Sequence, residues 1–504
     1  MIAVTVGVAP ALALATALVL ATGGCTGGGH GVGEHCDTIS DCADGLQCFA
    51  GRCVPRCLHH IDCGDGYRCE GGQCRASAGI EGDPCSSELE CGPGLTCRLR
   101  QTLSTPPGTC ARHTTGGIPG ATCGVDADCR GGACALGHCV ELCAAPSECQ
   151  PRWACAAVPR LSDDATTLLG NFDACLPGTG SITFEIPLDP AVREPTVMLA
   201  VPSNAVALSA VLEVDDPFQR IGATLLESPL GRRLYELPVD RETYFRNRVR
   251  HQPSPGVSAL QIPGSPDEPL APGAYALSLG VFRDDGGPPS TGRRLRVTEK
   301  LGLGAALDLH FYFADLADHP CAATIGGDLD AESAQASPGF QDVYLAELRS
   351  ILSRALATGA TTYEDVVGHP ELASLSSDRA GELFALNTHD RGVAVFFVRS
   401  IAPAGVQLVV GGTPGVPLPG TRGSGVAISL DALCYRDWPT LARQTAHAVA
   451  RHLGLFRNVE PDGGLDPIVD SPSTLDNLMH YSEFGGTSLS AGQVEVLRTS
   501  PALR

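Results

Sequence analysis

The sequence predicts a multidomain chain in which disulfide-rich repeats precede an all-β, sandwich-like domain and then an α+β domain. Three observations lead to this prediction. Twenty of the 23 cysteines lie between Cys36 and Cys175. The following stretch is rich in β-branched residues and in Pro and Gly turns, and residues 301–504 mix strand-like runs with amphipathic helices. The length of 504 residues suggests three or four domains, and 43% hydrophobic with 18% charged residues is a globular balance.

The amino terminus carries an apolar segment that ends at a cysteine. Residues 2–22 are apolar or small, and two glycines precede Cys25. This arrangement resembles a bacterial lipobox, which implies a signal peptide over 1–24, lipidation of Cys25 and a Gly-rich tether over 25–35. No Lys or Arg precedes the run, and Thr22 stands where lipoboxes usually place Leu, so a transmembrane anchor and plain secretion stay open. All three readings place the protein in the cell envelope, as an outer-membrane lipoprotein, or outside the cell, and not in the cytoplasm.

The cysteines of residues 36–176 fall into five sets of four with similar spacing, which indicates an array of internal repeats. Each repeat has few large apolar residues, so disulfides must hold it together. The fifth set is expected to end with a long loop. The sets are Cys36, Cys42, Cys48, Cys53; Cys57, Cys63, Cys69, Cys74; Cys85, Cys91, Cys97, Cys110; Cys123, Cys129, Cys134, Cys139; and Cys143, Cys149, Cys155, Cys175.

The number of cysteines indicates an oxidising compartment and one cysteine that is lipidated. The total of 23 is odd, and removing Cys25 leaves an even number that can all pair. Cys321 and Cys434, the two outside the repeats, are expected to bridge, and closing a loop of roughly a hundred residues would contribute about 4–5 kcal/mol. Within a repeat, four cysteines allow three connectivities, and spacing does not choose among them. We favour first-to-third with second-to-fourth.

The repeats resemble small cysteine-rich modules of the Dickkopf or EGF-like kind, which are found in surface proteins. Zinc is the competing use of clustered cysteines, but the pairs are not spaced Cys-x2-Cys. The function of the array is either that of a spacer or that of an adhesive surface. We favour the spacer, because no aromatic cluster or charge patch marks a binding face.

Residues 180–300 are predicted to form the β-rich domain. Strands at this spacing, separated by Pro-Gly and Asp-Asp-Gly-Gly turns, suggest a sandwich. The domain resembles the accessory β-domains that precede many secreted peptidases. The arginine cluster between Arg241 and Arg250 is expected to be a solvated face. Strands are expected at 182–188, 196–201, 205–214 and 274–282.

Residues 301–504 are predicted to form the α+β domain. An amphipathic helix is expected at 341–356, with Gly359 as its stop. A later helix is expected to begin after Asp437, with Pro439 in its first turn, and to end at Gly454. Strands are expected at 307–314, 393–398, 406–410 and 426–430.

The later helix carries the motif with the most functional content. Residues 447–457 read His-Ala-Val-Ala-Arg-His-Leu-Gly-Leu-Phe-Arg. They resemble the zinc motif His-Glu-x-x-His-x-x-Gly-x-x-His of the metzincin metallopeptidases, with His447 at the first ligand position. Asn-Leu-Met at 477–479 resembles the Met-turn of these enzymes, with Met479 beneath the metal, and 489–498 resembles their last helix. The resemblance covers 301–504, is closest to the pappalysin-like secreted peptidases of bacteria, and implies a metzincin-like fold.

The same resemblance implies that the zinc site has been lost. Ala448 stands at the position of the general-base Glu, and Arg451 and Arg457 stand at the second and third ligand positions. A catalytic zinc needs about three protein ligands, and arginine cannot give up its proton to ligate a cation. We therefore expect no catalytic residue and no bound metal, and we expect His447 to be a buried, hydrogen-bonded histidine.

A remodelled metal site is the alternative. His452 lies about 140° around the helix from His447, so these two rings point apart. A site built from His447, Glu460, Asp462 or His480 stays open, and zinc would then be the cofactor.

The arginines could also replace the metal structurally. Arg451 and Arg457 could pair with Glu460, Asp462 or Asp470 and fill the former metal cavity, leaving a cleft that holds a peptide by its carboxylate.

The sequence thus predicts a cell-envelope lipoprotein with a catalytically inactive metallopeptidase-like domain that binds protein or peptide or is structural. The alternatives are an active zinc metalloendopeptidase with atypical ligands and a surface adhesion protein that acts through its cysteine-rich repeats. The expected partners are the membrane, through the lipid anchor at Cys25, and an unknown protein or peptide. The formal net charge of −21 argues against nucleic acid. Lys300 is the only lysine and does not lie in a Walker-type phosphate loop.

Overall fold

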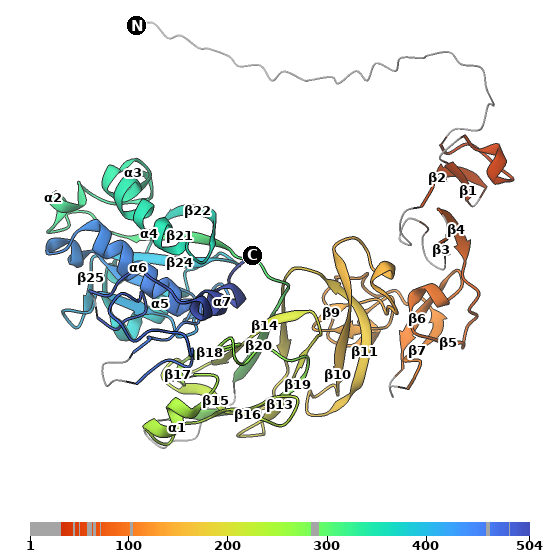
Figure 1. The fold of residues 1–504 in the computed structure, drawn as a ribbon, viewed down its shortest axis with the longest axis horizontal. Coiled ribbons are helices and arrows are strands. Elements are labelled where there is room, and N and C mark those ends of the chain that lie inside the picture. Colours follow the sequence, from red (N-terminus) through yellow and green to blue (C-terminus); the bar gives the residue numbers. More distant parts are fainter. Residues whose placement is uncertain are drawn as a thin grey trace, which may run out of the picture. The chain divides into compact units, whose positions relative to one another are not determined.

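The computed structural model (Figure 1) describes residues 32–43, 46–49, 51–57, 63, 67–70, 72–100, 104–251, 253–283, 292–459, 464–482 and 484–504. The predicted signal peptide over 1–24, Cys25 and most of the predicted tether lie outside these residues. The chain divides into two compact units, one formed by Met1–Leu58 with Cys69–Cys74 and the other by His59–Arg68 with Arg75–Arg504.

Each repeat consists of short strands or turns held by disulfides. The third and fourth cysteines of a repeat lie opposite each other on an antiparallel pair, as Cys48 and Cys53 do in the first repeat and Cys97 and Cys110 in the third. The elements are η1 (Ile39–Asp41), β1 (Leu46–Phe49), β2 (Arg52–Pro55), β3 (Tyr67–Glu70), β4 (Gln73–Ala76), β5 (Pro84–Cys85), η3 (Glu88–Glu90), β6 (Leu95–Leu99), β7 (Gly108–Arg112), η4 (Asp126–Asp128), β8 (Cys134–Ala135), β9 (His138–Cys139), η5 (Pro146–Glu148), β10 (Trp153–Leu161) and β11 (Leu168–Pro177).

The favoured disulfide connectivity is confirmed. In every pair that can be described, the first cysteine of a repeat bonds to the third or the second to the fourth, and Cys63 and Cys74 are also disulfide-bonded. The pairs are Cys36–Cys48, Cys42–Cys53, Cys57–Cys69, Cys85–Cys97, Cys91–Cys110, Cys123–Cys134, Cys129–Cys139, Cys143–Cys155 and Cys149–Cys175.

An acidic residue directly before the second cysteine closes a turn in four repeats. Asp41 and Asp128 each accept two hydrogen bonds from backbone N–H groups three and four residues earlier. Glu90 and Glu148 each accept one from four residues earlier. These carboxylates therefore order the segment between the first two cysteines, which is too short to be held by a core.

The predicted long loop of the fifth repeat is wrong. Residues between Cys155 and Cys175 form the hairpin β10–β11, in which these two cysteines lie opposite each other. Its buried side chains join a core shared by the later repeats and the next domain, so the array is not a string of separate repeats from the third repeat on. That core includes Leu99, Leu142, Val158, Phe172, Leu176, Ile182, Ala200 and Leu301.

The second domain consists of two antiparallel sheets that face each other, as expected for a sandwich. The first sheet has the order β12-β20-β14-β18, and the second has the order β13-β19-β15-β16 with β17 beside β15. Apolar side chains from both sheets share one buried cluster, which alternation along the strands produces. The elements are β12 (Gly180–Ile186), β13 (Thr196–Val201), β14 (Ala205–Val214), β15 (Arg220–Glu227), β16 (Arg233–Glu236), α1 (Arg241–Arg246), β17 (Ser254–Pro255), β18 (Val257–Ile262), β19 (Gly273–Phe282) and β20 (Arg293–Leu301).

The arginine cluster near α1 is not wholly solvated, contrary to prediction. Arg250 is 3% exposed. Its guanidinium lies 4.9 Å from the ring centre of Phe245, 5.3 Å from that of Tyr244 and 5.7 Å from that of Phe456, and it donates to the carbonyl of Leu465. Cation–π contacts and a carbonyl thus replace water around this charge.

The carboxy-terminal domain contains a five-stranded sheet in the order β22-β21-β24-β27-β26. The first four strands are parallel and β26 is antiparallel to β27. The strands and the short pair β23–β25 are β21 (Ala306–Ala314), β22 (Ala357–Asp365), β23 (Ser374–Ser376), β24 (Val393–Val398), β25 (Ser400–Ala402), β26 (Leu408–Val410) and β27 (Val426–Ser429).

Helices cover both faces of this sheet. Side chains of β21 alternate, so Phe311 packs in the cluster formed with α4 and α6, while Tyr312 packs in the cluster formed with α5. The helices are α2 (Ala322–Ile325), α3 (Ala331–Ala336), η6 (Gly339–Leu345), α4 (Ala346–Leu352), η7 (Pro370–Leu372), η8 (Ser377–Arg379), α5 (Ala380–Phe384), η9 (Leu430–Cys434), α6 (Trp438–His452) and α7 (Ala491–Thr499).

The predicted helix at 341–356 is confirmed only in part, and its predicted stop is wrong. The segment starts as the π-helical turn η6 and continues as α4, which ends at Leu352. Gly359 lies inside β22, where a Cβ atom would meet the carboxylate of Asp308 and the backbone of Leu307. The glycine therefore permits close approach of two strands and does not end a helix.

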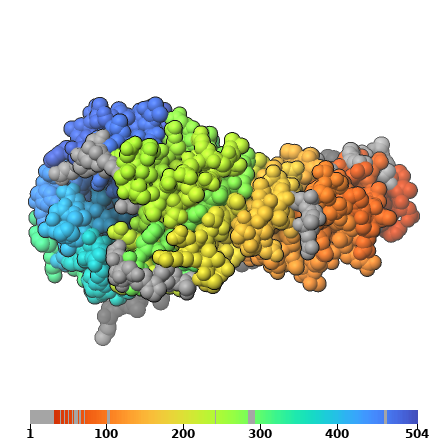
Figure 2. All heavy atoms as spheres, turned by 90° about the horizontal axis from the view of Figure 1, so that it is seen from below, coloured from red at the N-terminus to blue at the C-terminus, as the bar shows by residue number. Residues whose placement is uncertain are grey.

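The sandwich and the carboxy-terminal domain are in direct contact (Figure 2). Val211 and Val257 of the first sheet form a buried cluster with Val416 and Leu418 of the loop after β26. Lys300, on β20, is 1% exposed, and its ammonium donates to three carbonyls of the carboxy-terminal domain.

Candidate functional site

Helix α6 provides the frame of the candidate site, and its predicted ends are confirmed. The side chain of Asp437 accepts from the backbone N–H of Thr440, and Pro439 lies in the first turn. The helix ends at His452. Gly454 follows with a φ of +112°, a backbone conformation that residues other than glycine rarely adopt. The residues of the predicted motif therefore lie on the helix and on the turn just after it.

His447 is a buried, neutral, hydrogen-bonded histidine, as expected. It is 7% exposed, and its Nδ1 lies 2.8 Å from the carbonyl oxygen of Leu478. Because a carbonyl only accepts, Nδ1 carries the proton and Nε2 carries the lone pair. The pKa of His447 is lowered to about 3, mainly by burial and to a smaller extent by the charges of Arg451, Arg443 and Arg457, while the hydrogen bond to the Leu478 carbonyl raises it.

The arginines at the former ligand positions therefore lie within electrostatic range of His447. Arg443, which the motif does not include, acts on it as well. Arg443, His447 and Arg451 are spaced four residues apart and lie on one face of α6. This spacing was the sequence signal for Arg443, one turn before the motif.

Arg443 binds the chain segment beneath the helix. It is 7% exposed, and its guanidinium donates to three backbone carbonyls, those of Leu478 at 3.3 Å, Ser482 at 3.1 Å and Gly486 at 3.2 Å. Together with His447 it fixes residues 478–486 to α6 by direct hydrogen bonds. A charged donor makes such bonds stronger than a neutral one.

Met479 and Ala448 are both fully buried in the hydrophobic cluster of this domain. The Met479 N–H donates to the side chain of Asn477 at 2.8 Å, and Asn477 in turn bonds to Gln493 on α7. The turn that carries Met479 is thereby tied to the last helix. At the position of the general base, the methyl group of Ala448 contributes only packing.

His452 and His480, the other candidate ligands that the structure describes, make contacts of their own. The ring of His452 lies against Gly415 and bonds to the backbone of Gly425, and burial lowers its pKa to about 4. His480 accepts from the N–H of Ser482 at 3.1 Å and stacks on its neighbour Tyr481. Glu460 and Asp462 lie outside the described residues.

The proposed pairing of the arginines with Asp470 is wrong. The two carboxylate oxygens of Asp470 accept from the hydroxyl of Ser490 at 2.9 Å and from the N–H of Gly492 at 3.0 Å. Both donors belong to the start of α7, where a negative charge is favourable. Asp470 therefore stabilises the last helix.

Among the described residues, the motif positions do not fit a zinc ion. At these positions, the Nε2 lone pair of His447 is the one possible ligand. Structural and catalytic zinc sites use three or four protein ligands. The positive charges of Arg443, Arg451 and Arg457 oppose a divalent cation at that atom.

The predicted bridge between Cys321 and Cys434 is present, with the Cα atoms 5.1 Å apart. It joins the segment after β21 to the turn η9, which directly precedes α6. The bridge therefore constrains the loop that leads into the motif helix.

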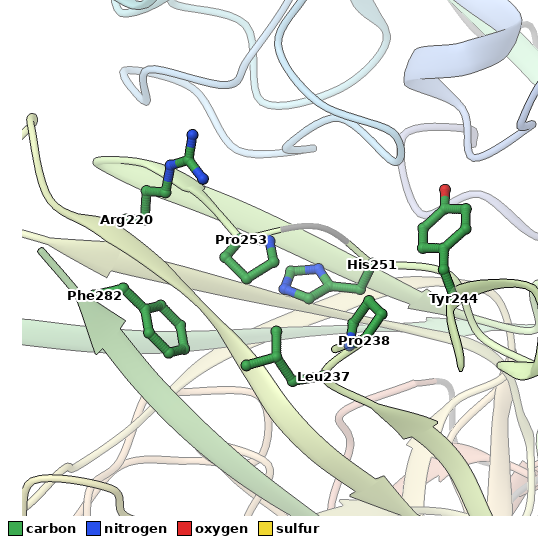
Figure 3. Close-up of a pocket in the computed structure, with 7 residues that line it drawn as sticks. All are labelled: Arg220, Leu237, Pro238, Tyr244, His251, Pro253 and Phe282. Carbon is green, nitrogen blue, oxygen red and sulfur yellow. The ribbon is translucent and has the colours of Figure 1, made fainter. Parts of the chain in front are cut away.

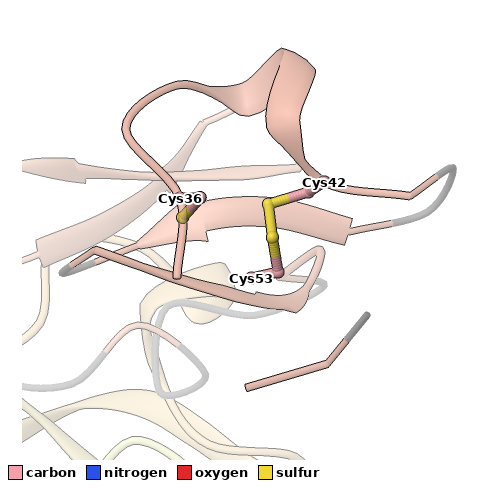
Figure 4. A group of neighbouring side chains, drawn as sticks. All are labelled: Cys36, Cys42 and Cys53. Carbon is pink, nitrogen blue, oxygen red and sulfur yellow. A yellow bond between two sulfur atoms is a disulfide. The ribbon is translucent and has the colours of Figure 1, made fainter. Parts of the chain in front are cut away.

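The cysteines of the repeats also form close groups. Three sulfur atoms lie within 4.8 Å of one another in each repeat, as in Cys36, Cys42 and Cys53 (Figure 4). All these cysteines are disulfide-bonded and so are not thiolates. Their closeness reflects two neighbouring disulfides, because metal ligation requires the thiolate.

Comparison with known proteins gives no family. No protein family model and no curated protein matches the sequence. Within the described residues, no helix is both long and apolar enough to cross a membrane. The metzincin resemblance therefore stays a prediction that rests on the motif residues.

Proposed function

We propose that this chain is a cell-envelope lipoprotein whose carboxy-terminal domain retains a metallopeptidase-like frame without zinc chemistry and serves protein or peptide binding or a structural role. The order of elements supports the frame: a helix, strands of a mixed sheet, a histidine-bearing helix ended by Gly454, a buried Met479 and a last helix. This order is the one that the sequence resemblance implies.

One observation carries the proposal of inactivity. His447 stays neutral and buried with its Nδ1 proton on the Leu478 carbonyl, and the charges of three arginines act on it. A metal cation bound to Nε2 would be repelled by the three guanidinium groups. The repulsion is strong because the site is buried and water screens the charges little. The same face of α6 cannot both hold the arginines and bind zinc by three ligands.

Hydrogen bonds from Arg443 and His447 can stabilise the domain in place of a metal. A bound metal joins a helix to the segments around it, whereas here Arg443 and His447 join α6 to residues 478–486 directly. Such a domain can present a surface or hold the sandwich in place without turnover.

Zinc content is the test. Purified full-length protein should contain no stoichiometric zinc by elemental analysis and should show no chelator-sensitive proteolysis. The double variant Arg451→His, Arg457→His restores two ligands and should bind zinc. Ala448 is left unchanged, because it packs in the core and the general base is not a ligand. The control Arg354→His, Arg379→His makes the same charge change elsewhere in the domain and should bind none.

Two results would decide against parts of the proposal. One zinc per native chain, removed together with proteolytic activity by a chelator, would establish the active-enzyme alternative. A folded double variant without zinc would show that the frame is not that of a metzincin. The lipid anchor is tested separately, since Cys25→Ser should release the chain from the membrane fraction.

A further inference from the structure

The sandwich contains a cavity of about 470 Å³ that is separate from the motif helix. It lies on the second sheet, near the starts of β15 and β17, the end of β19, and the segment from β16 to α1. Its volume is in the range of small-molecule sites, roughly 300–1,000 Å³. Figure 3 shows the side chains that line it.

The floor and walls of this cavity are mainly apolar. They are formed by Leu237, Pro238, Pro253 and Phe282, with the ring of His251 between them (Figure 3). None of these four side chains carries a hydrogen-bonding group. A ligand must therefore offer a compact apolar body to this part of the cavity.

His251 supports the wall of the cavity as a rigid, uncharged ring. It is 1% exposed, its Nδ1 donates to the carbonyl of Ala259 at 2.9 Å, and its Nε2 accepts from the N–H of Ala223 at 3.0 Å. Burial lowers the pKa of His251 to about 4, so the ring is neutral near pH 7. Both nitrogens are occupied by the protein, so the ring positions the wall and does not bind ligand by hydrogen bonds.

The polar groups stand on opposite sides of the apolar floor, with Arg220 on one side and Tyr244 on the other (Figure 3). Arg220 is paired across the sheet with Phe282, so both side chains project from the same face. Tyr244 is held in place by the guanidinium of Arg250, 5.3 Å from its ring centre. Within the described residues, Arg220 makes no ion pair, and it is the only charged side chain in the lining.

We propose that this cavity binds a carboxylate attached to an apolar body, with the carboxylate on Arg220 and the apolar body against Phe282, Leu237 and the two prolines. Arginine presents a planar pair of donors that matches a carboxylate. A cationic ligand would be repelled by Arg220, and a sugar would lose hydrogen bonds against the apolar floor. The ligand is either a free aryl or alkyl acid or the last residue of a peptide chain, since both present this chemistry.

Calorimetric titration of the full-length protein tests the site with three probes. They are 3-phenylpropanoate, its neutral isostere 3-phenylpropanamide, and N-acetyl-L-phenylalanine. We expect saturable binding of the acids and weaker binding of the amide by about 10- to 100-fold, because a charge-assisted hydrogen bond is lost. Tighter binding of N-acetyl-L-phenylalanine assigns a peptide end, and equal or tighter binding of 3-phenylpropanoate assigns a free acid.

Two variants locate the binding. Arg220→Gln should weaken the acids by the same factor and leave the amide unchanged, whereas Arg233→Gln, on the exposed surface of β16, should change neither. Leu237→Trp fills the floor and should abolish binding of all three probes. Equal affinity of acid and amide, an unchanged Arg220→Gln, or no binding at millimolar concentration overturns the proposal. None of these outcomes depends on zinc or on the motif helix.

Discussion

Replacing Lys300 with methionine tests how the sandwich is joined to the carboxy-terminal helix. The Lys300 ammonium donates to the carbonyls of Gly304 at 2.8 Å, Arg498 at 2.6 Å and Ser500 at 3.0 Å. Arg498 and Ser500 lie at the end of α7, where the helix dipole is negative and carbonyls lack helical partners. Methionine has a similar length and leaves all three carbonyls without this donor.

The expected loss follows from two opposing terms. Each hydrogen bond from a charged donor contributes about 1.5–3 kcal/mol. Against this, burial lowers the pKa of Lys300 from 10.5 to about 8, which corresponds to a cost of roughly 3 kcal/mol for keeping the charge. The balance predicts that Lys300→Met lowers the free energy of unfolding by about 3 kcal/mol.

The pH dependence has a defined sign. Because the pKa of Lys300 is lower in the folded state, the unfolded chain binds more protons between pH 8 and 10.5. The part of the stability that depends on the titration of Lys300 is therefore largest above pH 10.5 and is lost as pH falls to about 8, whereas the hydrogen bonds of the ammonium remain below that pH. The difference in stability between the native protein and Lys300→Met should widen across this alkaline window.

Guanidinium unfolding followed by tryptophan fluorescence measures the effect. The chain has two tryptophans, so Trp153→Phe leaves Trp438 at the start of α6 as the reporter of the carboxy-terminal domain. Arg233→Met is the control, because it removes an exposed positive charge whose ion pair with Glu236 is worth at most about 1 kcal/mol. Equal stability of the two methionine variants would refute the reasoning, as would rapid acylation of Lys300 by an amine-reactive reagent in native protein.

Three further predictions concern other buried polar groups. Glu299 is fully buried without a hydrogen-bond partner among the described residues, and burial raises its pKa, so its contribution is present below pH 4.5 and lost as pH rises. Glu299→Leu should raise the melting temperature at pH 7, and a decrease would contradict this. The lowered pKa values of His447 and His452 predict that stability falls as pH drops from 6.5 to about 4. His447→Asn, which keeps a donor for Leu478, should flatten that part of the acid unfolding curve. Arg443→Met should destabilise the domain by about 3 kcal/mol and speed amide hydrogen exchange at Leu478, and unchanged exchange would rule out the proposed contacts.

Strands with strong patterns could be predicted from the sequence. The runs at 196–201 and 205–214 match β13 and β14, and the continuous apolar run at 393–398 matches β24. Alternation or a fully apolar run is a local property of the chain, so it is visible without tertiary information. The helix ends at Asp437 and Gly454 were equally local, because a cap and a left-handed glycine act on adjacent residues.

Features that depend on distant contacts could not be predicted. Gly359 follows an amphipathic helix and so suggests a helix stop, but its role comes from Asp308 on the neighbouring strand. Arg250 belongs to an arginine-rich segment and suggests a solvated face, but aromatic rings from two domains surround it. In both cases the local sequence suggested one role for the residue, and a contact with a distant part of the chain gives it another.

The candidate site shows the same division. The loss of zinc ligands at Arg451 and Arg457 is readable from the motif, whereas the role of Arg443 depends on how residues 478–486 fold beneath the helix.

The acidic residue before the second cysteine of a repeat was visible in the sequence, since Asp41, Glu90, Asp128 and Glu148 occupy equivalent positions. Its function as an acceptor for turn N–H groups could have been inferred from that repetition.

Lys300 and Arg443 make the same kind of contact at two places in the protein. Each is a buried cation that donates to three backbone carbonyls. Carbonyls at a helix end or in an irregular segment have no ladder partner, so a multivalent donor satisfies several of them at once. On α6 this contact has a chemical consequence. The cation that ties the helix to residues 478–486 lies one turn from His447 and adds to the positive field there, so the contacts that stabilise the frame are the same contacts that disfavour a metal.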